Sequence, residues 1–154
     1  MSQGDPIRVY VTHGWQASDD YLRVFEYLES AKNFYYRNLS APDAIASLQV
    51  KPQVEGQREI MRKQMASAEV IIALSSLYFE QRDLLVFQLQ YAKACDRPVI
   101  LLNTFGRTVS LPKDVASLAD EVIEWDERAL SDAVRRHARH QDTTRWDTIE
   151  FKLD

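Results

Sequence analysis

Residues 69–102 read EVIIALSSLYFEQRDLLVFQLQYAKACDRPVILL, and this stretch decides the fold. Two short, almost wholly apolar runs, Val70–Leu74 and Val99–Leu102, flank residues 81–95, in which apolar side chains recur with helical spacing. Uninterrupted apolar runs are typical of strands that are buried on both faces of a parallel sheet. The stretch therefore predicts a strand–helix–strand unit with buried strands.

A polar turn is predicted directly after the first strand of this unit. It contains Ser75, Ser76 and Tyr78. In open parallel sheets, ligands bind where the chain leaves the carboxyl ends of the strands. This turn is therefore the first candidate for a ligand site.

The rest of the chain continues the alternation of strands and helices. Ser18 or Asp19 can cap a helix that ends near Ser30, and Asp126 can cap the last one. Residues 39–54 lack a clear period and predict a long loop. The other predicted elements are strands at 7–13, 33–38 and 121–125, and helices at 55–68, 115–119 and 126–139.

Five strands that alternate with helices predict an α/β fold with helices on both faces of the sheet. The expected architecture is a doubly wound, five-stranded parallel sheet of flavodoxin-like topology, with strand order 2-1-3-4-5. We expect one domain over residues 1–154, with its core at about 5–140 and a C-terminal tail at 141–154.

Composition and charge exclude several classes of protein. A net charge of −4 argues against a general nucleic-acid binder, whose surface is basic. No apolar run approaches the ~20 residues of a membrane span, so no membrane partner is expected. Cys95 is the single cysteine and no secretory signal opens the chain, so we expect a protein of the reducing cytoplasm.

Signatures of several chemistries are missing. The chain has only four glycines and no glycine-rich loop, which excludes a P-loop or a dinucleotide fingerprint. His137 and His140 lack a third metal ligand, and they are expected to stabilise the end of the last helix together with nearby arginines. The first and third strands do not end in an acidic residue, which argues against phosphotransfer. We therefore expect no metal and no permanently bound cofactor.

Gln88 is an oddity of the central helix, because it lies in the middle of the apolar face. Burying an unpaired amide costs about 1–3 kcal/mol, so this side chain needs hydrogen-bond partners or a cavity. The pattern leaves two interpretations open. Gln88 is either a fully hydrogen-bonded structural residue or part of a pocket at the edge of the sheet.

Two groups of side chains converge in the predicted topology. His13 and Trp15 follow the first strand, and the Ser75–Tyr78 turn follows the third. These strands are neighbours in the order 2-1-3-4-5, so both groups reach the same edge of the sheet. They are either ordinary strand-end residues or the walls of one crevice.

Four sequence motifs together resemble a known family. They are VYVTHGW at 9–15 followed by DDY at 19–21, FYYRNLSAP at 34–42, LSSLY at 74–78, and the segment from AK at 92–93 to RPVI at 97–100. In this order they resemble TIR-like domains, above all the group of bacterial Thoeris antiphage systems and a related archaeal domain. The resemblance covers roughly residues 5–125.

The resemblance implies a role in bacterial immune signalling. Active members of the family cleave the nicotinamide–ribose bond of NAD, and some cyclise the remainder into a signal. NAD or a derived nucleotide is thus the expected ligand or substrate, and other TIR-like subunits or a defence effector protein are the expected partners. The implied ligand contacts are His13, Gly14, Trp15, Asp19, Ser40, Asp43, Ser75, Ser76 and Tyr78.

The same resemblance places Gln88 at the position of the family's catalytic glutamate, ten residues beyond Tyr78. A carboxylate there stabilises an oxocarbenium-like centre, whereas an amide carries no charge and cannot. Glu80 and Asp83 are nearby acids that could substitute, although both are typical of a solvated helix start.

Two hypotheses follow for the function. The chain is an NAD-cleaving TIR-like enzyme, or it is a non-catalytic TIR-like module for nucleotide binding or assembly. If Gln88 lies in an intact pocket, Gln88→Glu should cost less than ~2 kcal/mol and should create or raise NAD cleavage.

Overall fold

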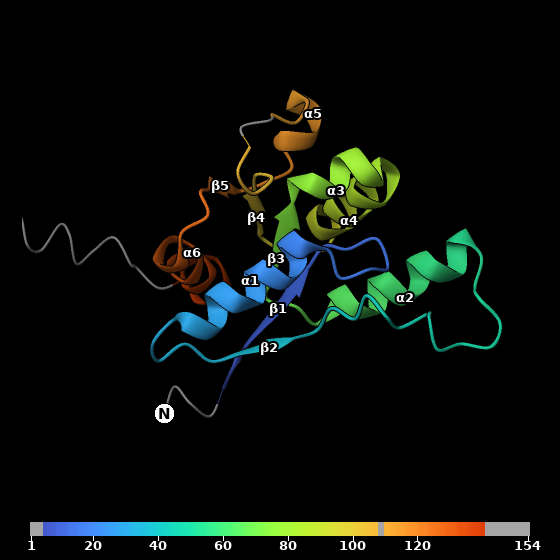
Figure 1. Cartoon of the computed structure of the whole chain (residues 1–154), viewed down its shortest axis with the longest axis horizontal. Coiled ribbons are helices and arrows are strands. Elements are labelled where there is room, and N and C mark those ends of the chain that lie inside the picture. Colours follow the sequence, from blue (N-terminus) through green and yellow to red (C-terminus); the bar gives the residue numbers. More distant parts are fainter. Residues whose placement is uncertain (1–4, 108–109, 141–154) are drawn as a thin grey trace, which may run out of the picture.

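The computed structural model describes residues 5–107 and 110–140, and it shows a sheet with helices on both faces (Figure 1). All strand pairs are parallel, and the order is β2-β1-β3-β4-β5. This confirms the predicted flavodoxin-like α/β topology. The strands are β1 (Ile7–Val11), β2 (Tyr36–Asn38), β3 (Val70–Leu74), β4 (Val99–Leu102) and β5 (Glu121–Ile123).

The helices form two layers around the sheet. Side chains that alternate along each strand point to opposite faces, which divides the core into two apolar clusters. The first cluster joins the sheet to α1 (Asp19–Ser30) and α6 (Glu127–Arg139). The second joins it to α2 (Val54–Ala66), α3 (Ser75–Glu80), α4 (Arg82–Ala94) and α5 (Lys113–Ala116).

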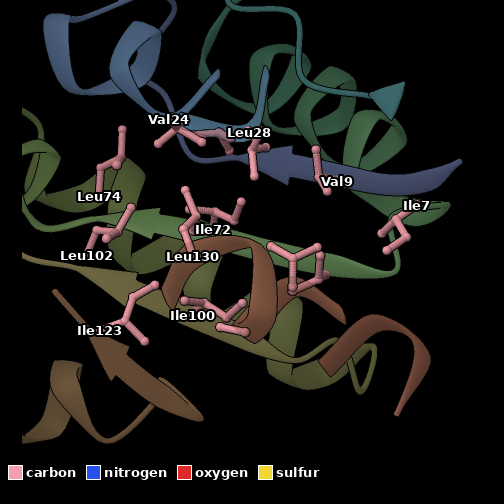
Figure 2. Packing of buried hydrophobic residues seen from close by; sticks show 14 of the residues in the cluster. Ile7, Val9, Val24, Leu28, Ile72, Leu74, Ile100, Leu102, Ile123 and Leu130 are labelled. Carbon is pink, nitrogen blue, oxygen red and sulfur yellow. The ribbon is translucent and has the colours of Figure 1, made fainter. Parts of the chain in front are cut away.

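The first cluster is centred on β1, β3 and β4, as Figure 2 shows. Val9, Ile72 and Ile100 are fully buried on the face that α1 and α6 cover. Burying one such side chain stabilises the fold by about 1.5–3 kcal/mol. The central strands therefore carry much of the stability, as the two apolar runs of the sequence predict.

Both predicted helix caps are present. The hydroxyl of Ser18 accepts a hydrogen bond from the Tyr21 backbone N–H at 3.2 Å. The carboxylate of Asp126 accepts one from the Ala129 N–H at 2.8 Å. Each cap satisfies a backbone donor that the first helical turn leaves without a partner.

Three of the predicted strands are shorter in the structure. β1 ends at Val11 rather than at residue 13, because the Thr12 hydroxyl accepts the Leu74 N–H at 3.0 Å in place of a backbone carbonyl. β2 starts at Tyr36 rather than at residue 33, since Asn33 has a left-handed φ of 54°. β5 ends at Ile123 rather than at residue 125.

The polar stretch after β3 is a helix and not the predicted turn. Ser75 and Ser76 open α3, which runs directly from the end of β3. Gln81 interrupts the helix with φ −145° and ψ 72°, and α4 begins at Arg82. The prediction of a turn was wrong because serine is common in both turns and first helical turns.

A group of ion pairs and hydrogen bonds around Glu69, here called the ionic clasp, lies at the edge of the sheet where β1 and β3 begin. The Glu69 carboxylate accepts hydrogen bonds from the Arg8 backbone N–H and from Arg139 Nη2, both at 3.0 Å. The Arg139 guanidinium holds the pKa of Glu69 below its ordinary value, with a smaller contribution from the Arg8 N–H. Arg139 also donates to the Pro6 carbonyl at 3.2 Å. The end of α6 is thereby fixed to the start of β1 and β3.

Candidate functional site

Gln88 is fully buried, with 0% of its surface exposed. Its Oε1 accepts hydrogen bonds from the Tyr10 hydroxyl at 2.6 Å and from the His13 backbone N–H at 3.2 Å. Its Nε2 donates to the backbone carbonyls of His13 and Leu84, both at 3.0 Å. The amide thus uses both of its donors and both acceptor positions.

This geometry favours the structural interpretation of Gln88. A side chain with four protein partners and no exposed surface has no hydrogen-bonding capacity left for a ligand. The two carbonyl partners also require a donor at Nε2, which an ionised carboxylate lacks. The environment of residue 88 therefore matches an amide and does not match the catalytic acid that the resemblance to TIR-like domains implies at this position.

His13 links three segments of the carboxyl edge. Its Nδ1 accepts the Trp15 backbone N–H at 3.1 Å, so the ring proton lies on Nε2, which is 3.0 Å from Gln64 Oε1. Gln64 in turn pairs with the backbone of Ala41 through Oε1 at 3.1 Å and Nε2 at 3.2 Å. Burial lowers the pKa of His13 to about 4, against a smaller opposing effect of the Gln64 hydrogen bond. His13 is therefore a neutral, positioning side chain at neutral pH.

Gly14 leaves room for a side chain that bridges the loop after β1 and the junction between α3 and α4. Gln81 Nε2 donates to the Gly14 carbonyl at 2.9 Å. A Cβ on Gly14 would lie 2.2 Å from Gln81 Nε2, which is closer than any real contact. The absence of a side chain at position 14 therefore permits this bridge, which spans the two walls of the predicted crevice.

Gly14→Ala is expected to displace Gln81 and to cost about 1 kcal/mol of unfolding free energy, the value of one net hydrogen bond. The displaced group is the end of a flexible side chain, so the backbone need not move. Urea denaturation measures the cost. In a Gln81→Ala background the same substitution should be nearly neutral. An equal cost in both backgrounds would show that the bridge is not its cause.

Three residues implied by the resemblance lie apart from this crevice. Asp19 and Asp43 are exposed. Ser40 is buried, and its hydroxyl is 2.9 Å from that of Tyr21 and also donates to Asn38. These positions give no indication of a shared ligand site.

A cavity of about 460 Å³ lies at the carboxyl edge, beside β3 and β4. Ser76, Phe79 and Glu80 contribute to it from α3, and their spacing of three and four residues places them on one helical face. Thr104 and Arg107 contribute from the loop after β4. Of these five residues, the sequence predicted Ser76 as a ligand contact and noted Glu80 as a substitute acid. Phe79, Thr104 and Arg107 were missed.

A tight turn holds the loop side of this cavity. The Arg107 N–H donates to the Thr104 carbonyl at 3.0 Å, and Gly106 adopts a φ of 76° at the third position of the turn. That conformation favours glycine. Phe105 anchors the turn, because its N–H donates to Asp20 at 3.3 Å and the Arg23 guanidinium lies 3.7 Å from its ring centre.

Of the five buried side-chain polar atoms without a partner in the described residues, three lie at this edge, and the other two belong to Arg58 and Arg97. Among the described residues, Trp15 Nε1, Ser75 Oγ and Thr104 Oγ1 are buried and have no hydrogen-bond partner. Trp15 also has a left-handed φ of 69°, which is uncommon for a bulky residue. Such groups are rare in native proteins and mark sites where a ligand, an ion or water completes the structure.

The predicted contacts do not all share one cavity. Tyr78 and Asp83 line an adjacent depression over residues 78–84, which shares Phe79 and Glu80 with the cavity beside β3 and β4. His13 and Gln88 are buried beneath the Gly14–Gln81 bridge. The structure thus brings the predicted residues to one edge of the sheet but distributes them over its interior and two surface depressions.

A larger depression of about 1140 Å³ lies at the opposite edge of the sheet. Its charges are largely taken up by ion pairs, such as Lys93 with Asp120 at 3.2 Å and Arg8 with Glu69 at 3.7 Å. The C-terminal ends of α4 and α6 line it, and their partial negative charge offsets further cations. The charged residues that line this depression are therefore explained by ion pairs and by the helix ends within the fold.

Two absences hold for residues 5–107 and 110–140. That part of the chain contains no group of three or more histidine, cysteine or acidic side chains placed to hold a metal ion. It also contains no helix with the length and apolarity that crossing a membrane requires. The tail predicted at residues 141–154 lies outside the described residues.

Comparisons with known proteins bear on the fold alone. No family model and no curated protein matches the chain. Among solved structures, the chain is similar to the crystal structure of a conserved protein from Enterococcus faecalis V583, with a TM-score of 0.65 and 14% identity. The match covers 86% of this chain and 99% of that one. At this identity, the likeness shows a shared architecture.

Proposed function

We propose that this chain is a TIR-like module of bacterial immune signalling that binds NAD or a derived nucleotide and does not use residue 88 to cleave it. The environment of Gln88 carries the proposal. Its amide is tied to Tyr10, His13 and Leu84, and it has no exposed surface. The position that holds the acid in active relatives is a structural amide in this chain.

Ligand binding at the carboxyl edge is supported by two features. Ligands of doubly wound sheets bind at this edge. Here it carries an open cavity next to Ser76 and the unpartnered polar atoms of Trp15, Ser75 and Thr104. The expected partners, other TIR-like subunits or a defence effector protein, belong to the same proposal.

NAD cleavage remains a second candidate function through Glu80. This side chain supplies the carboxylate of the cavity that Ser76 lines. A carboxylate at such a position could hold the ribose hydroxyls and stabilise the developing positive charge. If the chain cleaves NAD, we therefore assign the acid to Glu80.

A paired measurement on the purified protein tests both candidates. Calorimetric titration with NAD and with ADP-ribose measures binding, and proton NMR follows the release of nicotinamide. We expect binding without release. Release that Glu80→Gln abolishes would establish the enzyme instead. Neither binding nor release, with or without a cell extract from infected bacteria, would show that the proposal is wrong.

A further inference from the structure

We propose that the cavity formed by Ser76, Phe79, Glu80, Thr104 and Arg107 is a nucleoside-phosphate site, in which each of three side chains takes one part of the ligand. Phe79 stacks on the base, Glu80 accepts hydrogen bonds from the ribose hydroxyls, and Arg107 binds the phosphate. The inference rests on the proposed nucleotide binding, and it places the ligand outside the Gln88 crevice.

The size of the cavity suits such a ligand. Its volume of about 460 Å³ lies within the range of roughly 300–1,000 Å³ that is typical of small-molecule sites. The cavity opens at the carboxyl ends of β3 and β4, and Ser76 and Thr104 are hydroxyl residues among those that line it. Space and polar groups therefore coincide at one place.

The α3 wall offers an aromatic surface next to a carboxylate. Phe79 is 54% exposed, so its ring is accessible to a ligand, and it lines the cavity together with Glu80. An aromatic ring can stack with any nucleobase, and such stacking contributes about 1–3 kcal/mol per base. A carboxylate is an acceptor that matches a pair of vicinal hydroxyls.

The loop after β4 places the cationic side chain of Arg107 at the cavity, on a backbone whose position is fixed. Arg107 is exposed and forms no ion pair with the described residues, in contrast to the paired arginines of the opposite edge. The turn at Gly106 and the anchored Phe105 fix the backbone from which Arg107 projects. Guanidinium groups bind phosphate through charge-assisted, often bidentate hydrogen bonds.

Thr104 gives independent support for a ligand at this wall. Its Oγ1 is buried and has no hydrogen-bond partner in the described part of the chain. A hydroxyl group can donate one hydrogen bond and accept two, so rotation of the Thr104 side chain toward the cavity would let a polar ligand group satisfy it.

Binding of three adenosine compounds tests the assignment. Calorimetry should show that AMP binds more tightly than adenosine and than 2′,3′-dideoxy-AMP. Arg107→Gln should weaken AMP about tenfold or more and adenosine hardly at all. Glu80→Gln should remove the preference for AMP over the dideoxy compound, and Phe79→Ala should weaken all three compounds about tenfold. Circular dichroism and thermal unfolding verify that each variant is folded.

Two exposed residues serve as matched controls. Arg128→Gln and Glu26→Gln change the same charges away from the cavity and from the depression beside it, and both should leave AMP affinity unchanged. If the wild type binds AMP and the three cavity variants bind it equally well, the site assignment is wrong while the proposed function stands. If the wild type binds none of AMP, NAD and ADP-ribose at millimolar concentration, both are wrong.

Discussion

Gln88→Glu is expected to lower the free energy of unfolding by about 3–5 kcal/mol at pH 7. An ionised carboxylate would face the carbonyls of His13 and Leu84, which now accept hydrogen bonds from the amide Nε2 at 3.0 Å. The site is fully buried, so water cannot compensate. The expected cost is larger than the value of less than ~2 kcal/mol that the sequence alone predicts, because that value considers only the similar size of glutamine and glutamate.

The pH dependence identifies the cause of this cost. Burial and the carbonyl oxygens raise the pKa of the introduced carboxyl group above its unfolded value. The deficit relative to the wild type should therefore grow as the pH rises from about 4.5 to 7. Urea denaturation of Gln88→Glu and of Gln90→Glu, which makes the same change at an exposed site on α4, measures it. Equal stability of both variants, or NAD cleavage by Gln88→Glu, would contradict the structural role of Gln88.

Acidification is expected to remove about 3 kcal/mol of stability through His13 alone. The pKa of His13 is about 4 in the folded chain and 6.5 in its ordinary state, because burial disfavours the charged ring. The unfolded chain therefore binds more protons between these values, and the free energy of unfolding falls as the pH drops from 6.5 to 4. Above pH 6.5 the contribution is fully present.

His13→Asn provides the comparison for this effect. The shorter amide can still accept the Trp15 N–H but does not titrate, so the slope between pH 6.5 and 5 should flatten. Glu69 and Glu121 have lowered pKa values, and their contributions are lost at lower pH, below the ordinary value of 4.5. An unchanged slope in His13→Asn would assign the acid sensitivity to another group.

The sequence predicts the fold well because the central strands are apolar throughout. Val70–Leu74 and Val99–Leu102 match β3 and β4 residue for residue, and all nine side chains are buried. Their strand–helix–strand arrangement determines a parallel sheet and a right-handed connection. The ends of β1 and β2 were less predictable, because side-chain hydrogen bonds of Thr12 and the backbone of Asn33 determine them.

The candidate site could be predicted from the sequence less well than the fold. The pattern located Gln88 on a buried face but left its role open, since three of its four hydrogen bonds go to the hydroxyl of Tyr10 and to backbone atoms of His13, 75 residues away. Phe79 and Arg107 carried no periodic signal, because one lies on a helix of six residues and the other in a loop. The turn that positions Arg107 has one visible sign in the sequence, which is Gly106.

The ionic clasp, which joins Arg139 to the start of the sheet, affects how the chain folds during its synthesis. β1 and β3 are made before α6, which covers one of their faces together with α1 and whose Leu130, Ala133 and Val134 are fully buried. The contact of Arg139 with Pro6 spans 133 residues. A nascent chain on the ribosome therefore exposes the part of this apolar face that α6 covers until α6 has been made, although the residues of α1, α2 and α4 are already present. We expect this interval to be the period in which the chain depends most on chaperones.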